Sequence, residues 1–404
     1  MHVPARRSFI LLLAALATVG PFSIDTFLPS LPALRTALGA TLLQSQQALT
    51  AYMLGFAVMS LWHGAISDAV GRRPVLLYAL AIYAVAALAC TVAPSIEVLL
   101  AARLVQGLFG GAGMIVSRAI IRDCYEGPAA QRMMSTVMLI FSIAPAIAPI
   151  LGGYMHEWFG WRSVFGFMLG GSVLLWVWAY RALPETLAPA QRAPLHAGTL
   201  ARGYWQIFTR TEFQWLAAAI AFNFATFFVY VSASPTFIID HLGLSATDFG
   251  VFFVPVIAGM MLGAALSGRL AGRLSYRRTV FAGYLVLGSG IGLNLALQAL
   301  VAPTLPPGTL HTFVSIAPLV VASAGQAMIA PSVQLMLMDL FPQRRGMMAS
   351  CQGFTQLMVS TVVAGVIAPW VSDTALHLAT ACAGFFVVGL TFWMVYHVTT
   401  RRST

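Results

Sequence analysis

Two short stretches share one pattern: Gly64-Ala-Ile-Ser-Asp68-Ala-Val-Gly71-Arg72-Arg73 in the first half of the chain, and Gly268-Arg-Leu-Ala-Gly272-Arg273-Leu-Ser275-Tyr-Arg277 in the second. Each stretch joins two long apolar runs, and its Gly and Arg residues predict a helix, a tight turn and a second helix. Both turns follow the second apolar run of their half. The pattern therefore predicts a duplicated unit of six helices.

The composition places these helices in a membrane. Hydrophobic residues make up 59% of the 404 residues and charged residues only 8%, whereas soluble domains carry about 25% charged residues. A spanning helix needs about 20 apolar residues. We therefore predict an all-α integral membrane protein with about 12 transmembrane helices in two pseudo-symmetric six-helix bundles. The expected spans are 8–31, 44–63, 74–94, 98–120, 132–155, 162–183, 214–238, 248–268, 279–301, 311–335, 346–370 and 375–398.

The stretch 184–213 is the longest segment without an apolar run, and it separates six spans from six. We predict an N-terminal bundle over 1–183, a cytoplasmic linker over 184–213 and a C-terminal bundle over 214–404. Tyr204, Trp205 and Phe208 lie near Arg202 and Arg210 in this linker. This mixture of aromatic and basic residues predicts that part of the linker lies on the membrane surface.

The basic residues are distributed unevenly across the predicted topology. All 22 are Arg, and the net charge is +10. Only Arg35 and Arg162 fall on one side, Arg103 lies inside a helix, and the others gather on the opposite side. Positive charge marks the cytoplasmic side, so both termini are expected there, in a bacterial inner membrane. This placement argues against nucleic acid, whose partners carry basic residues on one surface with stacking aromatics between them.

The cysteines predict no metal or redox centre. Cys90, Cys124, Cys351 and Cys382 lie far apart, without the spacing of metal ligands. We expect no cofactor, no bound metal and no catalytic residues. The lipid bilayer is an expected partner, and the chain is expected to be a monomer.

Five motifs resemble the major facilitator superfamily, and within it the drug:proton antiporters of the Bcr/CflA type. They are the loop 2–3 signature Gly64-x-x-x-Asp68-x-x-Gly71-Arg72-Arg73-Pro74, the fourth-span Arg103-Leu-Val-Gln106-Gly107, the fifth-span Ala148-Pro149-Ile-Leu-Gly152-Gly153, the first-span Phe22-Ser-Ile-Asp25-Thr-Phe-Leu-Pro29-Ser-Leu-Pro32, and the seventh-span Ser232-Ala-Ser234-Pro235. The chain departs from the family at Ile66, Ala69 and Ala148, where Leu, a basic residue and Gly are usual.

Asp25 and Arg103 are the two charges expected deep inside spans. An ionisable residue there costs at least about 2.5 kcal/mol and marks a pathway or proton relay by default. Counting from the span ends puts both at similar depths, about 8–9 Å below the same membrane face. We predict that Asp25 exchanges a proton for substrate while Arg103 tunes its proton affinity. The alternative is a buried ion pair that only holds helices together.

The loop 2–3 signature and the fifth span are expected to form a gate. The resemblance implies that Gly64, Asp68, Gly71, Arg72 and Arg73 help to close the inner side, and we expect Asp68 to pair with Arg118 or Arg122. Solvated charges that only set topology are the alternative for Arg72 and Arg73. Pro149, Gly152 and Gly153 are expected to seal the fifth span against leak, with simple helix packing as the alternative.

The expected substrate site combines one acid with apolar and amide side chains. Asn223, Phe227, Tyr230 and Ser234 are spaced three and four residues apart, which puts them on one helix face. Abundant Phe and Met suit a binder of varied apolar compounds, although most such residues pack helices or face lipid. The predicted substrate-binding residues are Phe22, Asp25, Tyr52, Gln106, Met138, Phe141, Asn223, Phe227, Tyr230 and Gln326.

Together with the family resemblance, these patterns predict a proton-coupled multidrug efflux antiporter that exports lipophilic cationic or neutral drugs from the cytoplasm. The expected partners are therefore protons and a small drug-like molecule, with a proton gradient as the energy source. The alternative within transport is a proton-coupled exporter or importer of a metabolite with the same fold. A membrane enzyme would need convergent catalytic groups, and only Asp25 and Arg103 come close. A sensor or scaffold without transport is the remaining alternative.

Overall fold

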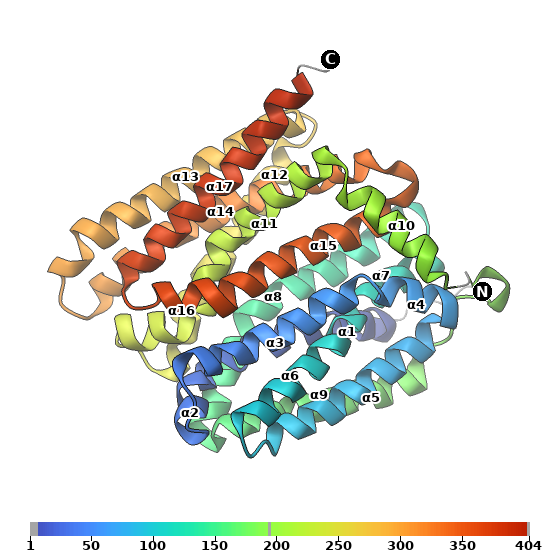
Figure 1. Ribbon diagram of the computed structural model, residues 1–404, viewed down its shortest axis with the longest axis horizontal. Coiled ribbons are helices and arrows are strands. Elements are labelled where there is room, and N and C mark those ends of the chain that lie inside the picture. The colour runs from blue at the N-terminus through green and yellow to red at the C-terminus, as the bar shows by residue number, and fades with distance from the viewer. Residues whose placement is uncertain (1–6, 193–194, 402–404) are drawn as a thin grey trace. The chain divides into compact units, whose positions relative to one another are not determined.

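The computed structural model describes residues 7–192 and 195–401, and its long elements are helices (Figure 1). In the described residues, eleven helices are long and apolar enough to cross a membrane, or twelve if one bent pair counts as a span. The predicted fold class is therefore confirmed. The helices of the first half are α1 (Arg7–Asp25), α2 (Leu31–Ala37), α3 (Leu42–Ser60), α4 (His63–Val70), α5 (Arg72–Thr91), α6 (Ile96–Gly110), α7 (Ala112–Cys124), α8 (Gly127–Phe159) and α9 (Trp161–Ala182).

The second half repeats this run of helices after one short surface helix. Its helices are α10 (Ala197–Phe208), α11 (Thr211–Ser232), α12 (Phe249–Leu270), α13 (Tyr276–Leu300), α14 (Thr309–Leu340), α15 (Arg345–Val362), α16 (Ala368–Val371) and α17 (Ala375–Arg401). Short π-helical turns cover Thr236–His241 after α11 and Val363–Ile367 between α15 and α16.

The bent pair is the second span. The axis turns by 49° between α3 and α4. A capping box fixes the start of α3, because the Thr41 side chain accepts from the Gln44 N–H while the Gln44 side chain accepts from the Thr41 N–H. Side-chain caps also start other spans: Ser95 accepts from the Val98 N–H at α6, and Ser275 from the Arg278 N–H at α13. Local sequence therefore sets where these helices begin.

The chain divides into two compact units, Met1–Ala197 and Gly198–Thr404. The stretch expected as a linker is thereby divided, because residues up to Ala197 group with the first unit and the rest of α10 with the second. The first unit packs α1 on α8, α3 on α6 and α5 on α9. The second packs α11 on α15, α12 on α14 and α13 on α17. These are the same three pairings of spans, so the units share one topology.

A hydrophobic core holds the first unit together around α1. Phe9, Leu12, Leu16, Leu76 and Ile120 belong to a cluster of buried side chains from α1, α5, α7, α8 and α9. Burying an aliphatic or Phe side chain contributes about 1.5–3 kcal/mol relative to leaving it in water. In a membrane the gain from burial is smaller, because an exposed side chain contacts apolar lipid tails instead of water. Close packing between helices therefore has to hold the unit together.

Candidate functional site

Asp25 is the last residue of α1 and is buried, with 5% of its surface exposed. Its carboxylate makes no hydrogen bond or ion pair with any other residue in the described part of the chain. Buried acids usually have such partners, because an isolated ionised carboxylate in an apolar medium is very costly. Asp25 is therefore buried within a span, and its carboxylate oxygens are free to bind a proton or a ligand.

Arg103 on α6 is fully buried and is held by three hydrogen bonds. Its Nη2 donates to the Ser23 carbonyl oxygen at 3.0 Å, its Nε to the Ala48 carbonyl oxygen at 3.2 Å, and its Nη1 to Gln106 Oε1 at 2.7 Å. The guanidinium thus bridges α1, α3 and α6. A guanidinium has five N–H donors in a fixed fork, which suits it to this bridging.

Three aromatic rings surround the same guanidinium, and we call them the aromatic cage. The Arg103 Cζ lies 4.4 Å from the ring centre of Tyr52, 4.5 Å from that of Phe27 and 5.9 Å from that of Phe165. Such cation–π contacts stabilise a desolvated cation by about 2 kcal/mol or more. No carboxylate in the described residues forms an ion pair with Arg103. The buried Asp25–Arg103 ion pair, considered as an alternative from the sequence, is therefore not found.

The fifth-span motif lies directly against the Asp25 segment. A Cβ placed on Gly152 of α8 would lie 2.7 Å from the Thr26 carbonyl carbon and closer still to its oxygen. Real Cβ atoms show essentially no contacts under 3.0 Å, so only glycine allows α8 to pass here. Ala144 and Ala148 on α8 are also buried. The small residues of this motif therefore set the position of the backbone next to Asp25.

The other predicted substrate residues of the first unit differ in exposure. Tyr52 and Gln106 are fully buried beside Arg103, and the Gln106 amide also approaches the Met168 sulfur at 3.7 Å. Phe22 is half-buried, with its ring 6.4 Å from that of Phe167. Phe141 packs against the hydrophobic core cluster. Direct substrate contact by these residues stays a prediction.

The second unit contains its own group of buried, uncharged polar side chains. Asn223, Tyr230 and Gln326 are buried and Phe227 is half-buried. The Tyr230 hydroxyl accepts a hydrogen bond from Asn294 Nδ2 at 2.8 Å. The side-chain oxygens of Asn223, Gln326 and Asn294 have no hydrogen-bond partner. Buried amides without partners are rare, so this unit offers acceptors for a polar ligand or for water. The sequence analysis did not single out Asn294. The available signal was a polar amide within the ninth span.

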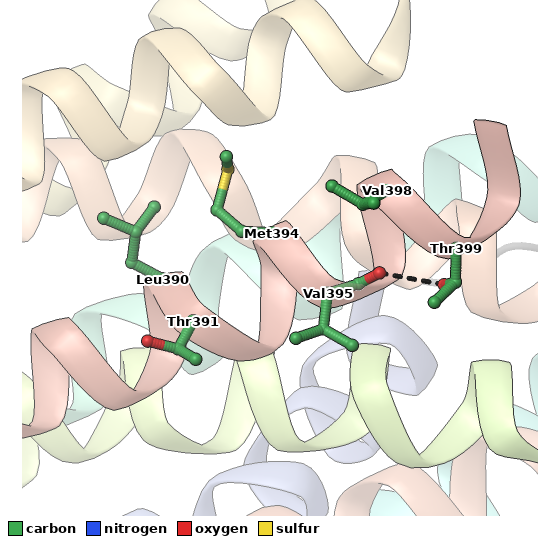
Figure 2. A pocket seen from close by; sticks show the side chains of 6 residues that line it. All are labelled: Leu390, Thr391, Met394, Val395, Val398 and Thr399. Carbon is green, nitrogen blue, oxygen red and sulfur yellow. Dashed lines mark hydrogen bonds between the residues drawn. The ribbon is translucent and has the colours of Figure 1, made fainter. Parts of the chain in front are cut away.

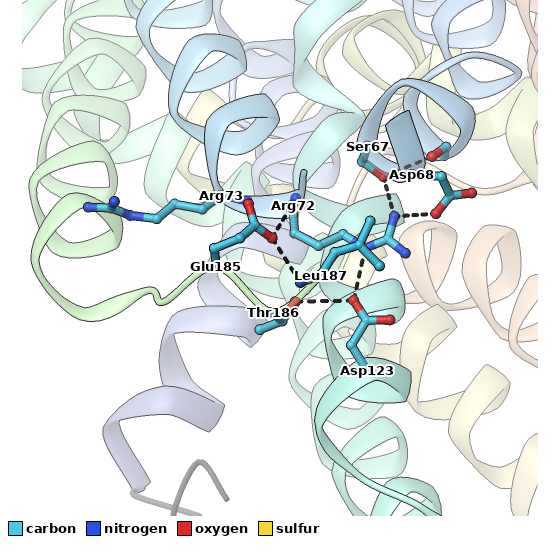
Figure 3. Close-up of polar contacts among 9 residues, drawn as sticks. Ser67, Asp68, Arg72, Arg73, Asp123, Glu185, Thr186 and Leu187 are labelled. Carbon is cyan, nitrogen blue, oxygen red and sulfur yellow. Dashed lines mark hydrogen bonds and ion pairs between the residues drawn. The ribbon is translucent and has the colours of Figure 1, made fainter. Parts of the chain in front are cut away.

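A network of charges closes the turn between α4 and α5, and Figure 3 shows its members. Arg72 is buried, and its Nη1 lies 2.5 Å from Asp68 Oδ1 while its Nε lies 2.9 Å from Asp123 Oδ2. Arg72 Nη1 also donates to Ser67 Oγ at 2.7 Å. The carboxylate of Asp123, at the end of α7, accepts from the Thr186 hydroxyl at 3.1 Å. One guanidinium therefore ties together α4, α5 and α7.

Glu185 caps the N-terminus of α5. Its carboxylate accepts from the backbone N–H of Arg72 at 3.0 Å, of Arg73 at 3.3 Å and of Leu187 at 3.0 Å. The first N–H groups of a helix have no partner within the helix, and an acid there also meets the positive end of the helix dipole. Gly71 has φ of 119°, and a Cβ there would lie 3.1 Å from Glu185 Cδ. Glycine at this turn therefore makes room for the cap. We call Asp68, Arg72, Asp123 and Glu185 the turn network.

The turn network corrects one expectation and adds two residues. Asp68 pairs with Arg72 four residues later, and the proposed pairing with Arg118 or Arg122 is wrong. Arg118 instead donates to the Met138 sulfur at 3.7 Å. Asp123 and Glu185 were missed, although Glu185 stands directly after the sixth span in the sequence. Their position at the ends of spans was the available signal in the sequence. Their partners could be identified only from the packing of α5, α7 and α9 in the structure.

The remaining predicted gate residues lie at or near these same helices. The Arg73 Nη2 donates to the Tyr180 carbonyl oxygen at 2.7 Å, and its guanidinium lies over the Tyr180 ring. Gly64 lies in α4, with only ordinary contact distances around it. Pro149 and Gly153 lie within α8. The structure thus assigns Arg73 to the joint between α5 and α9, and leaves leak prevention by α8 a prediction.

An open apolar groove of about 470 Å³ runs along α17 and contains none of these groups (Figure 2). It is lined by Leu390, Thr391, Met394, Val395, Val398 and Thr399. The one hydrogen bond drawn there joins the Thr399 hydroxyl to the Val395 carbonyl of the same helix. The groove has no ionisable group and no predicted site residue.

Comparison with known proteins decides the family. Residues 11–369 match the family model of the Major Facilitator Superfamily. The chain belongs to this superfamily. The resemblance read from the sequence motifs is thereby confirmed, and the chain is a multi-pass membrane protein of a family whose members are generally transporters rather than enzymes.

Several bacterial members of the superfamily align with nearly the whole chain. It is 28% identical to a bicyclomycin resistance protein homolog of Haemophilus influenzae, over 98% of this chain and 96% of that protein. It is 30% identical to the uncharacterised transporter YdgK of Bacillus subtilis, over 91% of this chain and 90% of that protein. It is 26% identical to multidrug resistance protein D of Escherichia coli, over 94% of each.

Proposed function

We propose that this chain is a proton-coupled multidrug efflux antiporter of the bacterial inner membrane. It exports lipophilic cationic or neutral drugs from the cytoplasm, driven by the proton gradient and without a cofactor. Both termini and the turn between α4 and α5 lie on the cytoplasmic side, in keeping with the distribution of Arg. Similarity to proteins named for bicyclomycin and multidrug resistance supports the substrate class.

The observation that carries the proposal is the buried, unpartnered carboxylate of Asp25. In its ionised form it attracts a proton or a cationic drug, and both would use the same oxygen atoms. Protonation from the outer side removes the negative charge and weakens drug binding there. Release of the proton to the cytoplasm restores the charge for the next drug molecule. Mutual exclusion at one carboxylate therefore couples the two movements.

Arg103 has a supporting role in this scheme. Its hydrogen bond to the Ser23 carbonyl oxygen and its contact with the Phe27 ring attach the guanidinium to residues on both sides of Asp25. Among the described residues no carboxylate pairs with Arg103, so its positive charge is left to tune the proton affinity of Asp25. Movement of α1 relative to α6 would change this influence, which gives a route by which conformation controls proton loading.

The turn network is the proposed structural support of the cytoplasmic gate in the first unit. Arg72 and Glu185 hold the ends of α4, α5, α7 and α9 as one block. A block that moves as a unit lets one bundle rock without local unfolding. On this view Asp68 and Arg72 support the gate rather than only setting topology.

Proton release from acidified everted vesicles tests the proposal. Phenicols and lipophilic cations are added to wild type, to Asp25→Asn and to a control, Asp373→Asn, whose acid is exposed. We expect drug-induced proton release in wild type and the control and none in Asp25→Asn. Equal release in all three would remove Asp25 as the carrier. Silence in wild type, with the protein shown in the membrane, would reject the drugs tested and favour a metabolite substrate.

A further inference from the structure

The helix α10 has two chemically different faces. Gly203 and Ile207 are buried, whereas Arg202 is exposed and Trp205 is 71% exposed. Arg202 and Trp205 are three residues apart and so lie on the same side of the helix. An indole left open beside an arginine is typical of a helix at a membrane–water interface, where the ring sits among the lipid headgroups.

The buried face docks onto the second unit. A Cβ on Gly203 would lie 2.7 Å from the Met347 sulfur, so the backbone of α10 lies close against α15. Gln206 Oε1 accepts from Arg344 Nη1 at 2.7 Å. Burial, together with the nearby Cys351 of α15, raises the pKa of the Tyr204 phenol to about 12. The helix α10 is therefore fixed to the turn between α14 and α15.

The position of α10 is also limited by the chain. Only Thr209 and Arg210 separate it from α11, which spans the membrane from Thr211. Two extended residues reach about 7 Å, so α10 cannot move far from the level at which α11 enters the bilayer. Arg210 strengthens this joint, because its Nη1 donates to the Leu340 carbonyl oxygen at 2.8 Å. The exposed face therefore stays at headgroup depth.

The charge around this face is positive. No Asp or Glu occurs from residue 186 to 211. Three arginines belong to α10 and to the α14–α15 turn, Arg202, Arg344 and Arg345, whereas the adjoining segments hold two acids. One of these, Glu212, is already paired with Arg210 at 3.2 Å, and the other, Asp339, lies in the last turn of α14. An anionic surface suits this balance better than a neutral one.

We propose that the exposed face of α10, centred on Arg202 and Trp205, binds the headgroups of anionic phospholipids and so holds α10 docked on the α14–α15 turn. The leaflet follows from the orientation in the proposed function, which puts α10 on the cytoplasmic side. The guanidinium donates to the lipid phosphate while the indole lies among the headgroups. Lipid composition thereby acts on the turn through Gly203 and Gln206.

Tryptophan quenching by brominated lipids tests this without any transport measurement. The full-length protein is reconstituted in vesicles that contain brominated phosphatidylglycerol or brominated phosphatidylcholine. The difference between wild type and Trp205→Phe isolates the signal of Trp205. We expect about two- to fivefold stronger quenching of Trp205 by the anionic lipid. Arg202→Gln should abolish this preference, whereas Arg278→Gln, an exposed arginine of α13, should retain it.

Three results would overturn the proposal. Quenching by neither lipid would show that the exposed face of α10 meets water. Equal quenching by both lipids, or a preference that survives Arg202→Gln, would remove the anionic headgroup site. A chain that shows the expected quenching but no drug-induced proton release would refute the drug:proton function alone, so the two proposals fail separately.

Discussion

Replacing Gly152 with alanine inserts one methyl group between α8 and α1, beside Asp25. The new Cβ would lie 2.7 Å from the Thr26 carbonyl carbon, whereas ordinary contacts begin at 3.4 Å. The two backbones must therefore separate by at least about 0.7 Å, and overpacking of this kind costs about 1–3 kcal/mol. Neither partner can yield by rotating a side chain, because the contact is with backbone atoms. The displacement acts directly on the Asp25 segment.

We expect Gly152→Ala to insert in the membrane but to lose at least about tenfold in drug export. A tenfold loss corresponds to a free-energy cost of about 1.4 kcal/mol, which lies within the cost of overpacking. Its melting temperature in detergent should fall by about 2–10 °C. Gly170→Ala on α9 is the matched control, because nothing lies within 4 Å of its new Cβ. Both changes gain the same helix propensity, so their difference isolates the clash. Wild-type export and melting by Gly152→Ala would refute the reasoning.

Three further changes test other parts of the structure. Glu185→Ala leaves three N–H groups without an acceptor, at about 1–3 kcal/mol for each buried donor; melting should fall by several degrees, and by less in Glu185→Gln, and equal melting of both variants would contradict the cap. Arg103→Lys cannot supply the same three hydrogen bonds, so drug resistance of cells that carry it should drop at least about tenfold, and wild-type resistance would contradict the bridging role. Burial raises the pKa of Tyr204 to about 12 from 10. Between pH 10 and pH 12 the folded state therefore keeps a proton that the unfolded state has lost. The stability of the docked helix falls as pH rises through this window. The tyrosinate absorbance that disappears in Tyr204→Phe should therefore emerge near pH 12 rather than pH 10, and emergence at 10 would contradict the docking.

The sequence predicted most of the fold, because the lipid bilayer restricts which structures a spanning chain can form. Long apolar runs must be helices, since unpaired backbone groups are too costly in hydrocarbon. The bend between α3 and α4 was less visible, because both helices are apolar and no proline marks the break at Leu61 and Trp62. The similar depths of Asp25 and Arg103 were predictable from residue counts alone, whereas the absence of an ion pair between them was not.

The candidate site divides in the same way. The motif around Gly152 predicted close packing, and tertiary structure identified Thr26 as the partner. Asp68 was expected to find a distant arginine, yet it pairs with one four residues later. Arg72 begins α5 and reaches acceptors on both α4 and α7, so only the path of the chain through the turn brings Asp68 within its reach. Glu185 shows the reverse case, because two of its partners, the N–H groups of Arg72 and Arg73, lie more than a hundred residues earlier.

By itself, the sequence determined the membrane as the solvent, the approximate number and the order of the helices, the repeat, and the two charges deep inside spans, Asp25 and Arg103. Apolar length, arginine placement and internal similarity act along the chain, so they can be read without coordinates. Only the tertiary structure decided what surrounds each charge: the aromatic cage for Arg103, the N-terminus of α5 for Glu185, and no partner for Asp25 among the described residues. These outcomes depend on distances between helices that are remote in sequence, and electrostatic and packing energies change steeply over a few ångströms.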